Sequence, residues 1–385
     1  MASKGRVNLI LGCNKIKNDN MVSYVNTKQS NDKLIGLEVI RFISALSVLV
    51  WHYQHFFYVA DKATDFVREQ QPFYEILKYL YVYGYNGVQV FWCISGFIFF
   101  WKYRIAISDK VVTYKKFFLL RFSRLYPLHF VTLLIVAFLQ IIYYNINKFF
   151  FVYQNSNLKH FFLQLLMASN WGFENGFSFN GPIWSISVEV LIYFFFFVVL
   201  RYVGRSSLVN IVVLLLCFFA KYIKISTPIV DCLIFFYMGG LSAIAYQYFE
   251  KTKLRDLIKS VALGFVIIVP FVAYATNIYQ KQYFAYLFLI TYTPFLLYVS
   301  AQDMAVHSIV RKIIEAAGNM TYSSYLIHFP IQLLIAVYCV VTHQAIPGYN
   351  PIFFLVFIFF TLYASYWTYR LFEMPLQLYI RQRFR

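Results

Sequence analysis

Long apolar stretches separated by short polar segments dominate the chain from about residue 34 onward. The stretches cover roughly residues 34–58, 79–101, 126–146, 183–200, 207–220, 229–248, 260–277, 283–300, 321–341 and 351–369. A helix of about 20 apolar residues crosses the hydrocarbon core of a bilayer, and these windows lie near that length. The pattern therefore predicts an all-α fold, a polytopic transmembrane helical bundle of about ten spans.

Composition and charge agree with a membrane protein. The 385 residues are 61% hydrophobic and only 13% charged, outside the range of soluble globular domains. If residue 1 lies in the cytosol, the inner segments hold 25 of the 34 Lys and Arg residues and the outer loops hold 8. This bias predicts both termini in the cytosol. Because the basic residues form no continuous face, the net charge of +18 does not indicate nucleic acid binding.

The N-terminal segment differs from the rest of the chain. Residues 1–33 carry six Lys and Arg residues around a short apolar patch, too short for a signal peptide, and are predicted to form a cytosolic tail. Residues 34–385 then form a single membrane domain. The five cysteines have no paired spacing, so neither a disulfide framework nor a zinc site is predicted.

The first apolar stretch contains ionisable residues that are costly inside a membrane. It reads LIGLEVIRFISALSVLVWHYQHFFYVA and includes Glu38, Arg41, His52 and His55. Arg41 and His52 are eleven residues apart, so they share a helix face about 16 Å apart along the axis. We predict that both face a polar passage. The alternative is that Arg41 only pairs with Glu38 while the histidines bond to neighbouring helices. No acidic or cysteine partner lies near the two histidines, so no metal site is predicted.

The most basic inner loop ends in Arg121-Phe-Ser-Arg124. Two arginines three residues apart share one helix face, and guanidinium groups bind phosphates bidentately. Arg121 and Arg124 therefore predict an anchor for a cytosolic ligand with several phosphates, such as a nucleotide or coenzyme A. A patch that binds lipid headgroups or sets topology is the alternative.

Other polar residues lie at defined depths in later spans. Trp184 is predicted at the outer interface and Glu189 about 9 Å deeper, beside His52, where a carboxylate would fix the imidazole tautomer. His328 is predicted at the depth of Arg41, lining the same inner cavity, and Gln89 is predicted to point inward. Near the C-terminus, Arg370 and Glu373 are spaced for a local ion pair.

The sequence resembles the membrane acyltransferase type 3 family, which includes bacterial surface-polysaccharide O-acetyltransferases. The resemblance runs from about residue 33 to the C-terminus and is carried by six blocks in the family's order. These are LEVIRFISALSVLVWH, GVQVFWCISGF, RFSRLYP, IWSISVEVLIY, GNMTYSSYLIHFP and YRLFEMP. The resemblance implies a multi-pass protein of the cell inner membrane. It also implies transfer of an acyl group, usually acetyl, from cytosolic acyl-coenzyme A to a sugar hydroxyl at the outer side.

The resemblance also implies roles for individual residues. Arg41 and His52 match the arginine and histidine of the family's first helix, and Glu189 matches its acidic residue after the Trp-Ser-x-Ser-Val block; these three are the predicted catalytic set. Arg121 and Arg124, with Arg41, are expected to hold the donor's coenzyme A. The candidate substrate-binding residues are Trp184, Ser187, Gln89 and His328. Acetyl-coenzyme A is expected as a donor substrate, with no permanently bound cofactor.

Two departures from the family pattern bear on the acceptor. Gln89 and Val190 stand where the family commonly has acidic residues. Many relatives also carry a fused extracytoplasmic esterase-like domain that completes transfer, and this sequence shows none. The chain is therefore expected to act alone on a glycan or lipid-linked sugar, or to pass the group to a separate partner.

A sugar transporter without acyl transfer is the alternative function, because midplane charges also occur in transporters. A structural subunit of a polysaccharide assembly complex is a third.

Overall fold

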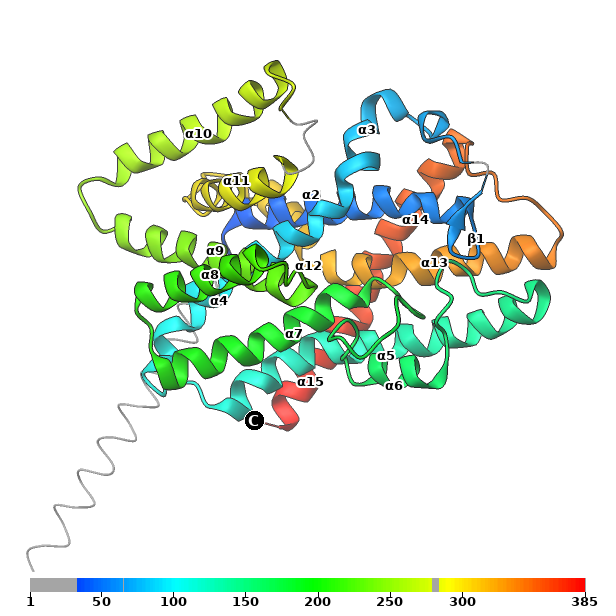
Figure 1. The fold of residues 1–385 in the computed structure, drawn as a ribbon, viewed down its shortest axis with the longest axis horizontal. Helices are drawn as coiled ribbons and strands as arrows, with labels where there is room; N and C mark the ends of the chain where they lie inside the picture. The colour runs from blue at the N-terminus through cyan, green and yellow to red at the C-terminus, as the bar shows by residue number, and fades with distance from the viewer. Residues whose placement is uncertain (1–32, 65, 279–283, 385) are drawn as a thin grey trace, which may run out of the picture.

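The computed structural model describes residues 33–64, 66–278 and 284–384. The predicted tail therefore lies outside the described residues except for Lys33. The described part is almost entirely helical (Figure 1). Its α-helices are α2 (Ile35–His52), α3 (Tyr74–Tyr83), α4 (Gly87–Ser108), α5 (Tyr114–Asn147), α6 (Leu158–Leu165), α7 (Ile183–Val198), α8 (Ser207–Tyr222), α9 (Pro228–Phe249), α10 (Arg255–Ala275), α11 (Phe284–Ser300), α12 (Ser308–Asn319), α13 (Thr321–Val341), α14 (Pro351–Thr368) and α15 (Met374–Arg383).

Short irregular elements extend several of these helices. The 3₁₀ turn η1 (Tyr53–Phe57) continues α2, and η3 (Gly84–Asn86) joins α3 to α4. The π-helical turns η4 (Val199–Val203) and η6 (Tyr369–Glu373) follow α7 and α14, and η2 (Arg68–Gln70) is a further 3₁₀ turn. The strands β1 (Tyr58–Val59) and β2 (Lys62–Ala63) pair antiparallel in the loop after η1.

The prediction of an all-α membrane bundle is confirmed. Within the described residues, 8 helical segments are long and apolar enough to cross a membrane. Nine of the ten predicted windows fall mainly on one apolar helix each, whereas the window 79–101 runs from α3 through η3 into α4. Two of the nine helices, α8 and α11, have only 16 and 17 residues. At 1.5 Å per residue these two rise roughly 24–26 Å, somewhat less than the hydrocarbon thickness of a typical bilayer.

Helix starts follow local capping chemistry. The Thr227 hydroxyl accepts a hydrogen bond from the backbone N–H of Val230, and Pro228 occupies the first position of α9. Asn350 and Pro351 begin α14 in the same way. A short polar cap followed by proline satisfies one free N–H and removes another, which is why these apolar helices start where they do.

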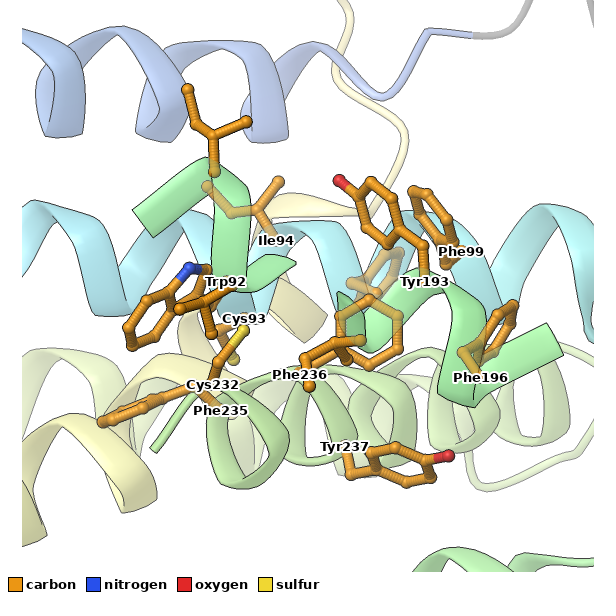
Figure 2. Close-up of a cluster of buried hydrophobic side chains, with 14 of the residues drawn as sticks. Trp92, Cys93, Ile94, Phe99, Tyr193, Phe196, Cys232, Phe235, Phe236 and Tyr237 are labelled. Atoms are coloured by element: carbon orange, nitrogen blue, oxygen red, sulfur yellow. The ribbon is translucent and has the colours of Figure 1, made fainter. Parts of the chain in front are cut away.

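Helix α4 packs closely against α9. A methyl group on Gly96 would overlap the carbonyl oxygen of Phe236, and one on Gly239 would overlap that of Cys93. Small residues let two membrane helices approach to backbone contact. Around this seam the rings of Phe99, Tyr193, Phe196, Phe235 and Phe236 form the largest apolar cluster (Figure 2). The seam fixes the position of α4, one wall of the candidate site.

Gly239→Val is expected to destabilise the folded protein by about 3 kcal/mol or more, because two branched methyl groups cannot fit against the Cys93 carbonyl. Thermal melting in detergent measures the effect. Gly264→Val on α10 is the matched control, since nothing lies within 4 Å of a Cβ atom added at Gly264. Equal melting midpoints for the two variants would contradict close packing at the α4–α9 seam.

Candidate functional site

A cavity of about 450 Å³ lies among α2, α4, α5, α7, α13 and the C-terminal helix. It lies at the end of the bundle where α2 begins, because the α2 residues in its wall, Leu37, Glu38 and Arg41, all belong to the first half of that helix. Six basic side chains line it: Lys33, Arg41, Lys102, Arg121, Arg124 and Arg381. Among the described residues, the lining contains two carboxylates, Glu38 and Glu189. The excess of cations makes the cavity suited to a ligand with several negative charges.

Arg41 lies in the cavity wall and is paired. Its guanidinium is 3.0 Å from the Glu38 carboxylate, as the alternative interpretation of this stretch expected, and both residues still face the cavity. The end of α12 holds Glu38 in place, since a methyl group on Gly318 would overlap its carboxylate. Next to it, Lys33 Nζ donates to Asn319 Oδ1, and burial lowers the pKa of Lys33.

Arg121 and Arg124 both line the cavity, as their spacing on one helix face predicted. Arg121 donates to the Tyr103 hydroxyl at 2.9 Å and lies 4.8 Å from the ring centre of Phe99. These contacts orient the guanidinium without neutralising its charge. The buried carboxylate of Glu373 interacts electrostatically with the Arg124 guanidinium.

Glu189 also lines the cavity, but it is not placed beside His52. It accepts a hydrogen bond from Tyr193 at 2.5 Å, and the Tyr193 ring stacks on Phe99 at 4.2 Å (Figure 2). The predicted Glu189–His52 pairing is therefore wrong in its geometry: His52 contacts other histidines instead.

The reason for this difference is the depth at which α7 begins. Residues 178–183 are all buried, and Asn180 donates to the backbone carbonyl of Leu326 on α13. The segment before α7 thus enters the bundle, so the helix does not start at the outer surface. The prediction assumed that α7 begins at the outer surface, and it therefore placed Glu189 too close to that surface.

Three buried histidines form a second polar group, beyond the cavity. The ring centres of His52 and His328 are 4.8 Å apart, and those of His52 and His55 are 4.9 Å apart. All three side chains are less than a tenth exposed. The prediction that His328 lines the inner cavity with Arg41 is therefore corrected: it lies with His52, while Tyr322 and Tyr325 of the same helix reach the cavity wall.

The remaining predicted substrate-binding residues lie elsewhere. The Ser187 hydroxyl is buried and donates to the carbonyl of Met167, which makes it a structural contact. Gln89 is half-buried, with its amide placed to donate to the backbone carbonyls of Tyr85 and Asn86.

Trp184 lies between the cavity and the segment before α7. Its ring is 5.6 Å from that of Trp92, a residue of the cavity wall, in an edge-to-face arrangement. Its other side borders a small depression that also includes His160. Burial lowers the pKa of His160, whose Nε2 accepts from the Asn175 N–H. Trp184 therefore contacts the cavity wall through Trp92 on one side and lines the small depression on the other.

Several site residues gave no clear sequence signal. Tyr193, Ser185 and Tyr325 have hydroxyls in the cavity wall, yet in the sequence they are ordinary members of aromatic helices. Glu373 does not form the predicted local pair with Arg370: it accepts from Ser323, and Arg370 donates to Tyr366. The π-helical turn Tyr369–Glu373 changes the helix face of these residues, which local spacing cannot anticipate.

Comparison with known proteins identifies a family. The family model described as an acyltransferase domain, acyltransferase 3, matches residues 34–370. No curated protein and no solved structure matches the chain at a significant level. The match covers the three histidines, nearly all of the membrane bundle, and the cavity wall except for Lys33, Gln377 and Arg381. The chain therefore belongs to the acyltransferase 3 family and is a multi-pass membrane acyltransferase.

Proposed function

We propose that this acyltransferase moves an acyl group, acetyl in the simplest case, from cytosolic acyl-coenzyme A to a sugar hydroxyl of a surface polysaccharide or lipid-linked glycan at the outer face of the cell inner membrane. The observation that carries the proposal is the 450 Å³ cavity with its six basic side chains. The bias of Lys and Arg toward the inner segments orients this end of the bundle to the cytosol.

The donor would bind with its phosphates on the basic wall. Arg121 and Arg124 offer planar forks that suit phosphate oxygens, and Lys102 adds a further cation from α4. Aromatic side chains in the same wall, among them Trp101 and Tyr103, offer faces for an adenine ring. The thioester arm then extends along α2 past Arg41, over the roughly 16 Å that separates Arg41 from His52 by helical rise.

His52 would act as the general base. Its Nδ1 lies 2.9 Å from the Val48 carbonyl, which can only accept, so Nδ1 carries the proton and Nε2 carries the lone pair. The Nε2 atom takes the proton of the acceptor hydroxyl as its oxygen attacks the thioester carbon. Arg41 and Glu189 contribute the electrostatic environment of the thioester arm rather than a direct contact to His52.

Surface polysaccharide analysis tests the proposal. Cells with and without the gene are compared for base-labile acyl esters, and membranes are assayed for release of coenzyme A thiol from acetyl-coenzyme A with extracted polysaccharide added. We expect both the ester and acceptor-dependent thiol release to require the protein. Sugar movement across proteoliposomes that persists without acyl-coenzyme A, together with an unchanged ester content, would instead support the transporter alternative.

A further inference from the structure

The buried group of His52, His55 and His328 contains more titratable side chains than a single general base requires. His52 belongs to α2, His55 to η1 and His328 to α13, and their exposed fractions are 7%, 3% and 1%. Polar side chains inside a membrane bundle are costly and mark functional positions. His328, whose ring contacts His52, is therefore a candidate for a function of its own.

Hydrogen bonds fix the same tautomer on all three rings. Nδ1 of His328 lies 3.1 Å from the Ser324 carbonyl, as Nδ1 of His52 does from Val48, so each Nδ1 donates. Gln332 donates its Nε2 to the His52 carbonyl, which turns its Oε1 toward His55 Nδ1 at 3.2 Å. In the neutral state each ring therefore presents Nε2 as an acceptor.

His328 lies between His52 and the cavity wall. Its ring centre is 4.8 Å from that of His52 and 6.1 Å from that of Tyr325. Tyr325 and Ser185 are both residues of the cavity wall, and their hydroxyls are 2.7 Å apart. Among the described residues, His328 Nε2 is a buried atom without a hydrogen-bond partner. An unpaired buried acceptor destabilises the folded state, and such an atom is free to accept a proton during a reaction.

We propose that His328 relays the proton that His52 removes from the acceptor hydroxyl to the departing thiolate of the donor; this inference rests on the proposed function. As the acceptor oxygen bonds to the acyl carbon, the C–S bond breaks and its electron pair goes to sulfur. The acceptor proton passes from His52 Nε2 to His328 Nε2 and then, by way of the Tyr325 and Ser185 hydroxyls, to the thiolate. The products are the ester and the free thiol, and all three imidazoles return to the neutral state.

A change of leaving group tests the relay. With acetyl-coenzyme A, an alkyl thioester, His328→Gln is expected to lower kcat by about 100-fold, while KM for the donor changes by less than about twofold. With the acetyl thioester of nitrothiophenol, whose thiolate leaves without being protonated, the loss in kcat/KM relative to wild type is expected to fall below about fivefold. His52→Gln removes the base for both donors and should be equally impaired with each.

Tyr325→Phe is the second variant, because it keeps the ring and removes only the hydroxyl next to Ser185. It should show a smaller loss with the same dependence on the leaving group. Equal losses with both donors, in either variant, would mean that the residue only supports the structure, and a fully active His328→Gln would also overturn the relay. Failure of the proposed function looks different: wild-type protein would then transfer acyl groups from neither donor.

Discussion

His52→Gln is expected to lower the rate of acyl transfer by about 10²–10⁴-fold, the usual contribution of a general base. Glutamine can still donate to the Val48 carbonyl, so the local backbone is retained, but it cannot take a proton from an alcohol at neutral pH. The measurement is kcat for acceptor-dependent thiol release by the purified full chain. KM for acetyl-coenzyme A should stay within about twofold, because uniform donor binding is unaffected.

His343→Asn is the matched control for this variant. His343 is exposed in the loop after α13 and has a φ of 54°, a left-handed conformation that asparagine accepts readily. We expect wild-type activity from it. A His52→Gln protein that melts like wild type and retains more than about a tenth of its kcat would contradict the assignment of His52 as base.

The second large effect is expected on donor affinity. Arg121→Gln combined with Arg124→Gln should raise KM for acetyl-coenzyme A by about 100-fold or more, because each charged hydrogen bond to phosphate contributes about 1.5–3 kcal/mol. These contacts are expected to bind the ground state and the transition state equally well, so their loss leaves kcat nearly unchanged. Replacement of both by lysine should restore only part of the affinity, since lysine keeps the charge but lacks the fork.

Lys115→Gln with Lys116→Gln controls for net charge. These two lysines lie on the same segment of α5, are exposed and do not line the cavity. Their loss removes the same number of positive charges, so a shift in KM of less than about threefold is expected from weaker steering alone. If both double variants raised KM equally, the basic segment would act as a diffuse surface, such as a patch for lipid headgroups, and not as a donor site.

Polar neighbours make the cations of the cavity compatible with a membrane bundle. Glu38 pairs with Arg41, Glu373 lies near Arg124, and Tyr103 accepts from Arg121. Each of these three arginines thus has a polar or acidic neighbour, which limits the cost of grouping like charges. A ligand with several phosphates gains most from the cations that keep unused donors, and Arg121 Nε is buried without a partner among the described residues.

Hydrophobic periodicity and charge in the sequence determined the class of protein, the approximate extent of its apolar helices and the grouping of Arg121 with Arg124. These features are local: a run of apolar residues has to be helical in a bilayer, and residues three apart share a helix face wherever the helix lies. The six blocks in family order further identified the acyltransferase class.

Only the tertiary structure decided which polar side chains meet. The buried segment 178–183, held by Asn180 on the α13 backbone, sets the depth of Glu189, which therefore contacts Tyr193 and not His52. The packing of α13 against α2 brings His328 to His52, whereas Arg41 lies in the cavity wall nearer the start of α2. Depth across a bundle depends on how loops fold back and on how helices are paired, and neither is encoded in the periodicity of a single helix.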